Sequence, residues 1–119
     1  MSVQLPELLA LEVSIGVPSR EEAETIGRIL VEERLAAAAN IIPGVQSIFW
    51  WDGAVRETTE AMLLLKTVPE RFERLRRRVR ELHSYVTPGI KGWAVVAGDP
   101  AWHEWLRREV GAAPEAAGR

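Results

Sequence analysis

Apolar residues recur at every second position from residue 9 to residue 17, a pattern that is typical of a strand with one buried face. Ser19 and Glu22 then have the three-residue spacing of a helix capping box. The helix predicted over residues 20–34 carries apolar side chains at helical spacing: Ala23, Ile26, Gly27 and Leu30. The first third of the chain therefore predicts a strand followed by a helix.

Two strands joined by a tight turn are predicted next. Residues 36–42 and 45–51 are strand-like on either side of Pro43-Gly44, where the proline lacks the N–H that a central ladder needs, so a bulge or a sheet edge is expected. Asp52-Gly53 is a strong two-residue hairpin signal. Residues 54–67 are therefore expected to run back alongside the preceding strand.

The last part of the chain predicts helix, strand and helix. Thr67 and Glu70 form a second apparent capping box, and the helix that follows is predicted over residues 69–83. A short strand is predicted at 90–97. Asp99-Pro100 opens a last helix with an apolar side made of Trp102, Trp105, Leu106 and Val110. The tail, residues 111–119, is expected to be flexible.

This order of elements predicts an α+β fold of the ferredoxin-like class, with the pattern βαββαβ, an antiparallel sheet, a long central hairpin and an extra C-terminal helix. A chain of 119 residues is long enough for one domain and too short for two. We expect a single domain over residues 1–119, ordered from about 8 to 110.

The central hairpin is too long for the domain that carries it. A strand from Ala39 to Trp51 spans roughly 43 Å at ~3.3 Å per residue, whereas a domain of this size is roughly 35 Å across. The hairpin must therefore bend or project. Trp50 and Trp51 are adjacent in the strand and must point to opposite faces. We expect one to enter the core of the domain and the other to pack against a neighbouring subunit.

Composition excludes several classes of protein. The chain has no cysteine, which removes disulfides, thiolate metal sites and cysteine nucleophiles. The net charge is −2, and the N-terminal stretch has no basic region of the signal-peptide type. No apolar run approaches the ~20 residues of a membrane span. We expect a cytoplasmic protein that does not bind membranes.

Two further activities are not expected. Six arginines crowd the predicted helix 69–83, but glutamates interleave them at helical pairing distances, which favours a solvated helix face over a nucleic-acid surface. No nucleophile–base pair, carboxylate dyad or glycine-rich phosphate loop stands out. We therefore expect neither nucleic-acid binding nor enzymatic activity.

Three stretches resemble the CutA divalent-cation tolerance family: "IIPGVQSIFWWDG", "ETTEAMLLLKT" and "ELHSYVTP", followed by a terminal helix with "WLRREV". The resemblance runs from about Leu9 to Val110. It implies a ferredoxin-like subunit in a homotrimer whose hairpin arms wrap neighbouring subunits. It also implies a role linked to copper and other divalent cations. The assembly is similar to that of the PII nitrogen-signalling proteins, so a signalling or adaptor role is the alternative.

The sequence departs from the family pattern at polar positions. Ala38 stands where family members often carry cysteine, and Gly89 stands where an acidic residue is usual. Ala54 replaces the usual polar residue after the hairpin glycine. We therefore expect no obligatory cofactor, and copper or another divalent cation only as a weak ligand. A structural or adaptor trimer with a decayed metal site is the corresponding alternative.

Glu60 and Lys66 are the first candidate ligand-binding residues. They share one side of their strand with Met62 and Leu64, and about 20 Å of strand separates them, so they cannot pair with each other. Half-buried charges need partners. Glu60 and Lys66 either line a cleft between subunits or form structural salt bridges, and the sequence leaves both readings open.

His83, Tyr85 and Trp51 are the remaining candidates. His83 ends the predicted helix 69–83, where it is either a metal ligand or a structural residue at the negative end of the helix dipole. Tyr85 and Trp51 are expected to form one wall of a small-molecule pocket, or simply to pack at a subunit interface.

Overall fold

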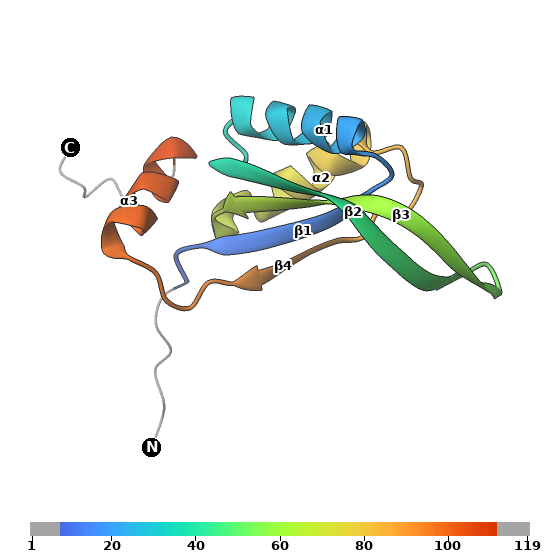
Figure 1. Ribbon diagram of the computed structural model, residues 1–119. Helices are drawn as coiled ribbons and strands as arrows, with labels where there is room; N and C mark the ends of the chain where they lie inside the picture. Colours follow the sequence, from blue (N-terminus) through green and yellow to red (C-terminus); the bar gives the residue numbers. More distant parts are fainter. Residues whose placement is uncertain (1–7, 112–119) are drawn as a thin grey trace, which may run out of the picture.

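The computed structural model describes residues 8–111 of the protein, and its elements follow the predicted order (Figure 1). The expected flexible tail falls almost wholly outside the described residues. The elements are β1 (Leu11–Val17), α1 (Arg20–Glu32), β2 (Ala38–Trp51), β3 (Ala54–Thr67), the short 3-10 helix η1 (Pro69–Arg71), α2 (Phe72–Leu82), β4 (Ile90–Ala94) and α3 (Pro100–Glu109). β4 ends at Ala94, three residues before the end of the strand predicted at 90–97.

The four strands form one antiparallel sheet in the order β2-β3-β1-β4. α1 and α2 lie on the same face of this sheet, and α3 lies at the end of the domain opposite the β2–β3 turn (Figure 1). The predicted ferredoxin-like α+β fold with a long central hairpin and an additional C-terminal helix is confirmed. No helix of residues 8–111 covers the other face of the sheet, which is called the helix-free face (Figure 1).

The main core lies between the sheet and its two helices. Alternate residues of β1 and β3 point into it and are fully buried, because side chains of a strand alternate between faces. α1 contributes Ile26 and Leu30, and α2 contributes Leu75 and Val79. A second, smaller cluster packs α3 against the start of β1 and the end of β3 through Ala10, Val68, Leu106 and Val110.

One of the two predicted capping boxes is present at a helix start. The Ser19 side chain accepts a hydrogen bond from the Glu22 backbone N–H at 3.1 Å and caps α1. The second capping box is wrong. Thr67 is the last residue of β3 and fully buried, so its hydroxyl donates to the Leu35 carbonyl at 2.6 Å and does not cap a helix.

The part of the β2–β3 hairpin that projects past the other elements, residues 45–60, is called the arm. A register shift between Ile42 and Val45 confirms the predicted bulge, with Gly44 at φ +73°. Asp52 and Gly53 both have positive φ, at 51° and 79°, as a type I′ turn requires. The Cα radius of gyration of 16.1 Å exceeds the ~13 Å of a compact domain of this size, as expected for a projecting arm.

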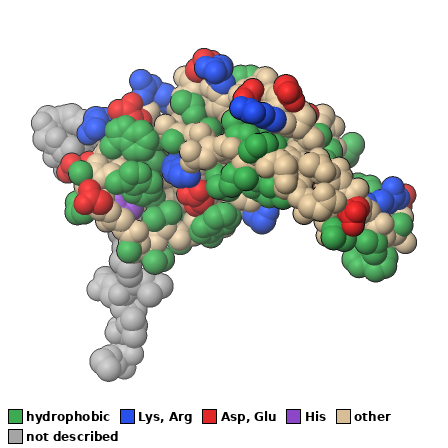
Figure 2. All heavy atoms as spheres, in the orientation of Figure 1, with side chains coloured by type: hydrophobic (Ala, Val, Ile, Leu, Met, Phe, Trp, Pro, Cys, Tyr) green, Lys and Arg blue, Asp and Glu red, His purple; other side chains and the backbone are tan. Residues whose placement is uncertain are grey.

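The expectation for the paired tryptophans was wrong in one respect. Neither enters the core: Trp50 is 74% exposed and Trp51 is 52% exposed. The reason is that the arm extends beyond α1 and α2, so no layer formed by the described residues covers its tip (Figure 1). Figure 2 shows hydrophobic side chains gathered at the end of the arm, where Ile48 and Val55 are also exposed.

None of the helices within residues 8–111 has the length and apolar character needed to cross a bilayer.

Candidate functional site

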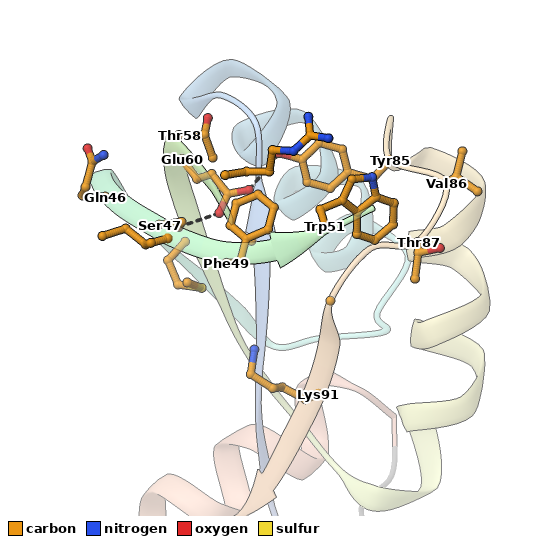
Figure 3. Close-up of a pocket in the computed structure, with 15 residues that line it drawn as sticks. Gln46, Ser47, Phe49, Trp51, Thr58, Glu60, Tyr85, Val86, Thr87 and Lys91 are labelled. Carbon is orange, nitrogen blue, oxygen red and sulfur yellow. Dashed lines mark hydrogen bonds between the residues drawn. The ribbon is translucent and has the colours of Figure 1, made fainter. Parts of the chain in front are cut away.

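A cleft of about 850 Å³ lies between the arm and the loop that joins α2 to β4 (Figure 3). We call it the arm cleft. Its walls come from the helix-free side of the arm, from Gly16 of β1 and Lys91 of β4, and from four loop residues: Tyr85, Val86, Thr87 and Gly89. The volume lies within the range of small-molecule sites. The aromatic lining residues are Phe49, Trp51 and Tyr85.

Glu60 holds the two walls of the arm cleft together. Its Oε1 atom accepts a hydrogen bond from the Ser47 hydroxyl at 2.7 Å, and its Oε2 atom accepts one from the Tyr85 hydroxyl at 2.8 Å (Figure 3). Gly16 lies directly behind this carboxylate, since a β-carbon there would come within 3.3 Å of Oε1. The glycine therefore leaves the space that the carboxylate occupies.

The Tyr85 hydroxyl is held in its neutral form. Partial burial, together with the hydrogen bond to the Glu60 carboxylate and the negative charges of Glu60 and Glu22, raises the pKa of Tyr85 to about 12. A phenolate at this place would face a carboxylate at hydrogen-bond distance. Tyr85 therefore acts as a hydrogen-bond donor to Glu60 and not as a base at neutral pH.

His83 is a buried residue whose two ring nitrogens both have partners. Its side chain is 0% exposed. Nε2 lies 2.8 Å from the Gly16 carbonyl oxygen and Nδ1 lies 3.0 Å from the Tyr85 backbone nitrogen. With these partners, Nε2 donates to the Gly16 carbonyl oxygen and Nδ1 accepts from the Tyr85 backbone N–H. The His83 and Tyr85 rings are also in contact, with centroids 4.9 Å apart.

The start of the loop is tied to α1. The Glu22 carboxylate accepts from the Ser84 backbone N–H at 2.8 Å and from the Ser84 hydroxyl at 2.9 Å. Sequence analysis assigned Glu22 only to the capping box of α1. In the structure its side chain fixes the residue that precedes Tyr85 and so helps to place the wall of the arm cleft.

Lys66 lies apart from the arm cleft. Its Nζ donates to Glu12 Oε2 on the neighbouring strand at 3.0 Å and to Asn40 Oδ1. Glu12 and Lys66 are paired in register across β1 and β3, on the helix-free face, and both side chains are more than three-quarters buried. Lys66 therefore already has a charge partner within the chain.

Of the candidate residues, the structure brings Trp51, Glu60 and Tyr85 together in the arm cleft, with His83 directly behind Tyr85. Sequence reasoning missed Ser47, Phe49, Arg56 and Lys91. The hairpin signal contained part of this information, because a two-residue turn at Asp52-Gly53 fixes the register and puts Ser47 and Phe49 on the same side as Trp51. Nothing in the sequence pattern placed Lys91 there.

The described residues do not fit a copper site. Within residues 8–111, no group of three or more His, Cys, Asp or Glu side chains is arranged to hold a metal ion. The Nδ1 lone pair of His83 already accepts the Tyr85 N–H, and its ring has no exposed surface that a neighbouring subunit can reach. Metal ligation at His83 would require this loop to open.

The comparisons with known proteins give the family. Residues 8–109 match the family model described as CutA1 divalent ion tolerance protein. The chain belongs to this family, and the resemblance found in the sequence is confirmed. It is 46% identical over 99 residues to the divalent-cation tolerance protein CutA of Thermus thermophilus. The aligned region covers 83% of this chain and 96% of that protein.

Solved structures agree with the fold. The divalent cation tolerance protein of Thermus thermophilus has a TM-score of 0.82 at 45% identity, covering 84% of this chain and 97% of that one. The protein CutA of Archaeoglobus fulgidus, described as a periplasmic divalent cation tolerance protein, also has a TM-score of 0.82, at 38% identity, covering 85% of this chain and 98% of that one.

Proposed function

We propose that this protein acts in divalent-cation tolerance as a homotrimer whose arms wrap neighbouring subunits, with a small ligand bound at the arm cleft. The observation that carries the assembly is the uncovered apolar surface of the arm and of the helix-free face. Ile42, Trp93 and both arm tryptophans are each about half exposed or more. Monomeric proteins rarely leave such contiguous apolar surface in water, and a projecting strand pair is an open template for another chain.

The family resemblance supports three as the number of subunits. In this arrangement the helix-free sheet faces point inward and the arm reaches over the adjacent subunit. Trp50 and Trp51 lie on opposite sides of the arm. Trp51 faces the arm cleft, and Trp50 lies on the other side, where a neighbouring subunit can cover it.

The test of assembly is the molar mass in solution. Sedimentation equilibrium is expected to give close to three times 13.3 kDa. Replacing Trp50 and Trp51 by Ala is expected to weaken association by about 2–4 kcal/mol for each hot-spot aromatic and to shift the mass toward the monomer. Val96→Ala, at an exposed apolar residue outside the arm, is the matched control. A stable monomer of the unaltered protein at micromolar concentration refutes the assembly.

A signalling or adaptor role without a tight metal site is the second candidate. The observation that favours it is the hydrogen-bonded, buried state of His83, the expected metal ligand. Copper is then a weak, non-obligatory ligand, and the protein needs no catalytic step. Calorimetric titration with copper is expected to show weak binding or none. A tight site that survives His83→Ala overturns this candidate, because its ligands then lie elsewhere.

We also propose a cytoplasmic location. The solved Archaeoglobus fulgidus relative is described as periplasmic, so the two assignments differ. Cell fractionation with a tagged full-length chain separates them: recovery with the soluble cytoplasmic markers supports the proposal, and recovery with periplasmic markers refutes it.

A further inference from the structure

The arm cleft contains two cations and one carboxylate. Arg56 and Lys91 both line it, together with Glu60. Among the described residues, no carboxylate lies within ion-pair distance of Arg56 or Lys91, and Lys91 donates only to the Ser14 hydroxyl, at 3.2 Å. Other cations of the chain, such as Arg78 and Arg107, do have carboxylate partners. The cleft therefore has an excess of positive charge that the described part of the chain does not neutralise.

The single carboxylate of the cleft is already occupied. Both oxygens of Glu60 accept hydroxyl protons, from Ser47 and Tyr85, and these bonds hold the carboxylate against the wall. A ligand cation that approached Glu60 would compete with two short hydrogen bonds. A ligand anion that approached Arg56 or Lys91 would meet charged donors without a carboxylate partner, and such bonds are stronger than neutral ones.

The rest of the lining is suited to a flat ring. Figure 3 shows the Phe49, Trp51 and Tyr85 rings gathered at one end of the cleft, with Lys91 entering from β4 at the other. Phe49 and Arg56 are directly opposite each other in the β2–β3 register, so a cation and an aromatic face lie side by side. Exposed aromatic faces bind planar groups by stacking, and Arg and Lys bind carboxylates or phosphates.

We propose that the arm cleft binds a small anion that carries a flat ring, namely a carboxylate or phosphate attached to an aromatic or heterocyclic ring. This inference rests on the proposed function only in using the same cleft, and it names the chemical class of the ligand. The ring stacks among Phe49, Trp51 and Tyr85, and the anionic group pairs with Arg56, which lies opposite Phe49 in the strand register. Lys91, at the other end of the cleft, adds to the positive charge that attracts the anion. Glu60 serves as a positioning residue that holds Tyr85 in the wall.

The experiment compares ring compounds of one size and different charge on the assembled protein. Naphthoate and naphthyl phosphate are the anions, naphthamide is the neutral isostere, and naphthylmethylammonium is the cation. Calorimetry and ligand-observed NMR are expected to give at least about tenfold tighter binding of an anion than of naphthamide, the effect of one charge-assisted hydrogen bond. Added salt is expected to reduce this preference. The ratio of naphthoate to naphthyl phosphate affinity distinguishes the two anionic groups.

Variants locate the binding. Replacing Arg56 and Lys91 by Gln is expected to abolish the preference for anions while the neutral compound binds as before. Arg74→Gln, at an exposed arginine of α2 outside the cleft, is the matched control and is expected to change nothing. Phe49→Leu is expected to weaken anions and neutral compound alike, because it removes a stacking surface.

Several outcomes overturn the inference. They are equal affinity for anion and neutral isostere, a preference for the cation, an anion preference that survives loss of Arg56 and Lys91, and no binding because a neighbouring subunit fills the cleft. The molar mass measured on the same sample separates this failure from that of the proposed function. A trimer without anion preference refutes only the ligand class, and a monomer with anion preference refutes only the assembly.

Discussion

The ionisation of Tyr85 gives the sharpest test of the arm cleft geometry, because it is the only tyrosine in the chain. The near-ultraviolet absorbance of phenolate therefore reports one known residue without any label. The perturbation is Glu60→Gln, which removes the negative charge that the Tyr85 hydroxyl faces at 2.8 Å and leaves an amide oxygen that can still accept the hydrogen bond.

The expected magnitude follows from the raised pKa. With a pKa of about 12, Tyr85 is about one-tenth ionised at pH 11, whereas a phenol at the ordinary value of 10 is about nine-tenths ionised. Burial is the largest cause of the shift and persists in the variant. Glu60→Gln is therefore expected to lower the midpoint while leaving it above 10, so that phenolate absorbance at pH 11 increases.

The direction of the pH effect on stability can be stated as well. A group whose pKa is higher in the folded than in the unfolded protein stabilises the folded state. This contribution is fully present below the unfolded-state pKa and is lost as the pH rises to the folded-state pKa. The contribution of Tyr85 is thus present below about pH 10 and is lost between about pH 10 and 12. Glu60→Gln lowers the pKa of Tyr85 in the folded protein and so lowers the upper limit of the pH range over which this contribution is lost.

Three controls make the titration decisive. Tyr85→Phe gives the baseline without phenol. Glu57→Gln alters an exposed glutamate on the other side of the arm and is expected to leave the midpoint unchanged. Far-ultraviolet circular dichroism establishes that the protein is folded across the range. A wild-type midpoint near 10 in the folded protein, or a midpoint that Glu60→Gln does not move, refutes the contact between Tyr85 and Glu60.

Two further predictions concern residues that sequence analysis assigned to ligand binding. His83→Ala is expected to lower the free energy of unfolding by about 2–4 kcal/mol, because it leaves the Gly16 carbonyl and the Tyr85 N–H without partners. Denaturant unfolding at fixed protein concentration measures this change. An unchanged unfolding midpoint contradicts the structural role of His83. Lys66→Met is expected to cost about 1–3 kcal/mol, since it strands the largely buried Glu12 carboxylate, and to leave anion binding at the arm cleft unchanged. Loss of anion binding in Lys66→Met would show instead that Lys66 lines the cleft, as the sequence suggested.

Local signals in the sequence were sufficient for most of the fold. The period of two in β1, the Ser19 cap, the bulge at Pro43-Gly44 and the Asp52-Gly53 turn each depend on residues within one element or one hairpin. The length of the hairpin also predicted that it projects. The Thr67 prediction failed because a capping box needs a free hydroxyl, and tertiary packing directs this one to the Leu35 carbonyl.

The arm cleft was only partly predictable for the same physical reason. Trp51, Phe49 and Ser47 share a side of one strand, which the turn register determines. Tyr85 meets Glu60 through long-range contacts that hold the loop after α2. Glu22 binds Ser84 across 62 residues, and His83 binds the Gly16 carbonyl across 67. No periodicity reports a contact of this kind.

The residues that position the walls of the arm cleft are different from the cations that would attract a ligand. A continuous set of bonds runs from Glu22 through Ser84 to the loop, and from His83 through Tyr85 to Glu60 and the arm. Each of these groups has a hydrogen-bond partner within the chain, so replacing one changes the shape of the cleft and the ionisation of Tyr85. Glu60→Gln also removes the one carboxylate of the cleft lining, a change that does not weaken the attraction of an anion. Within residues 8–111, Arg56 and Lys91 have no carboxylate partner, so their replacement changes the charge that a ligand meets and leaves Tyr85 in place. The variants that move the Tyr85 midpoint are therefore expected to differ from the variants that remove the anion preference. A residue whose replacement did both would have to contact both the hydrogen-bonded residues and the two cations.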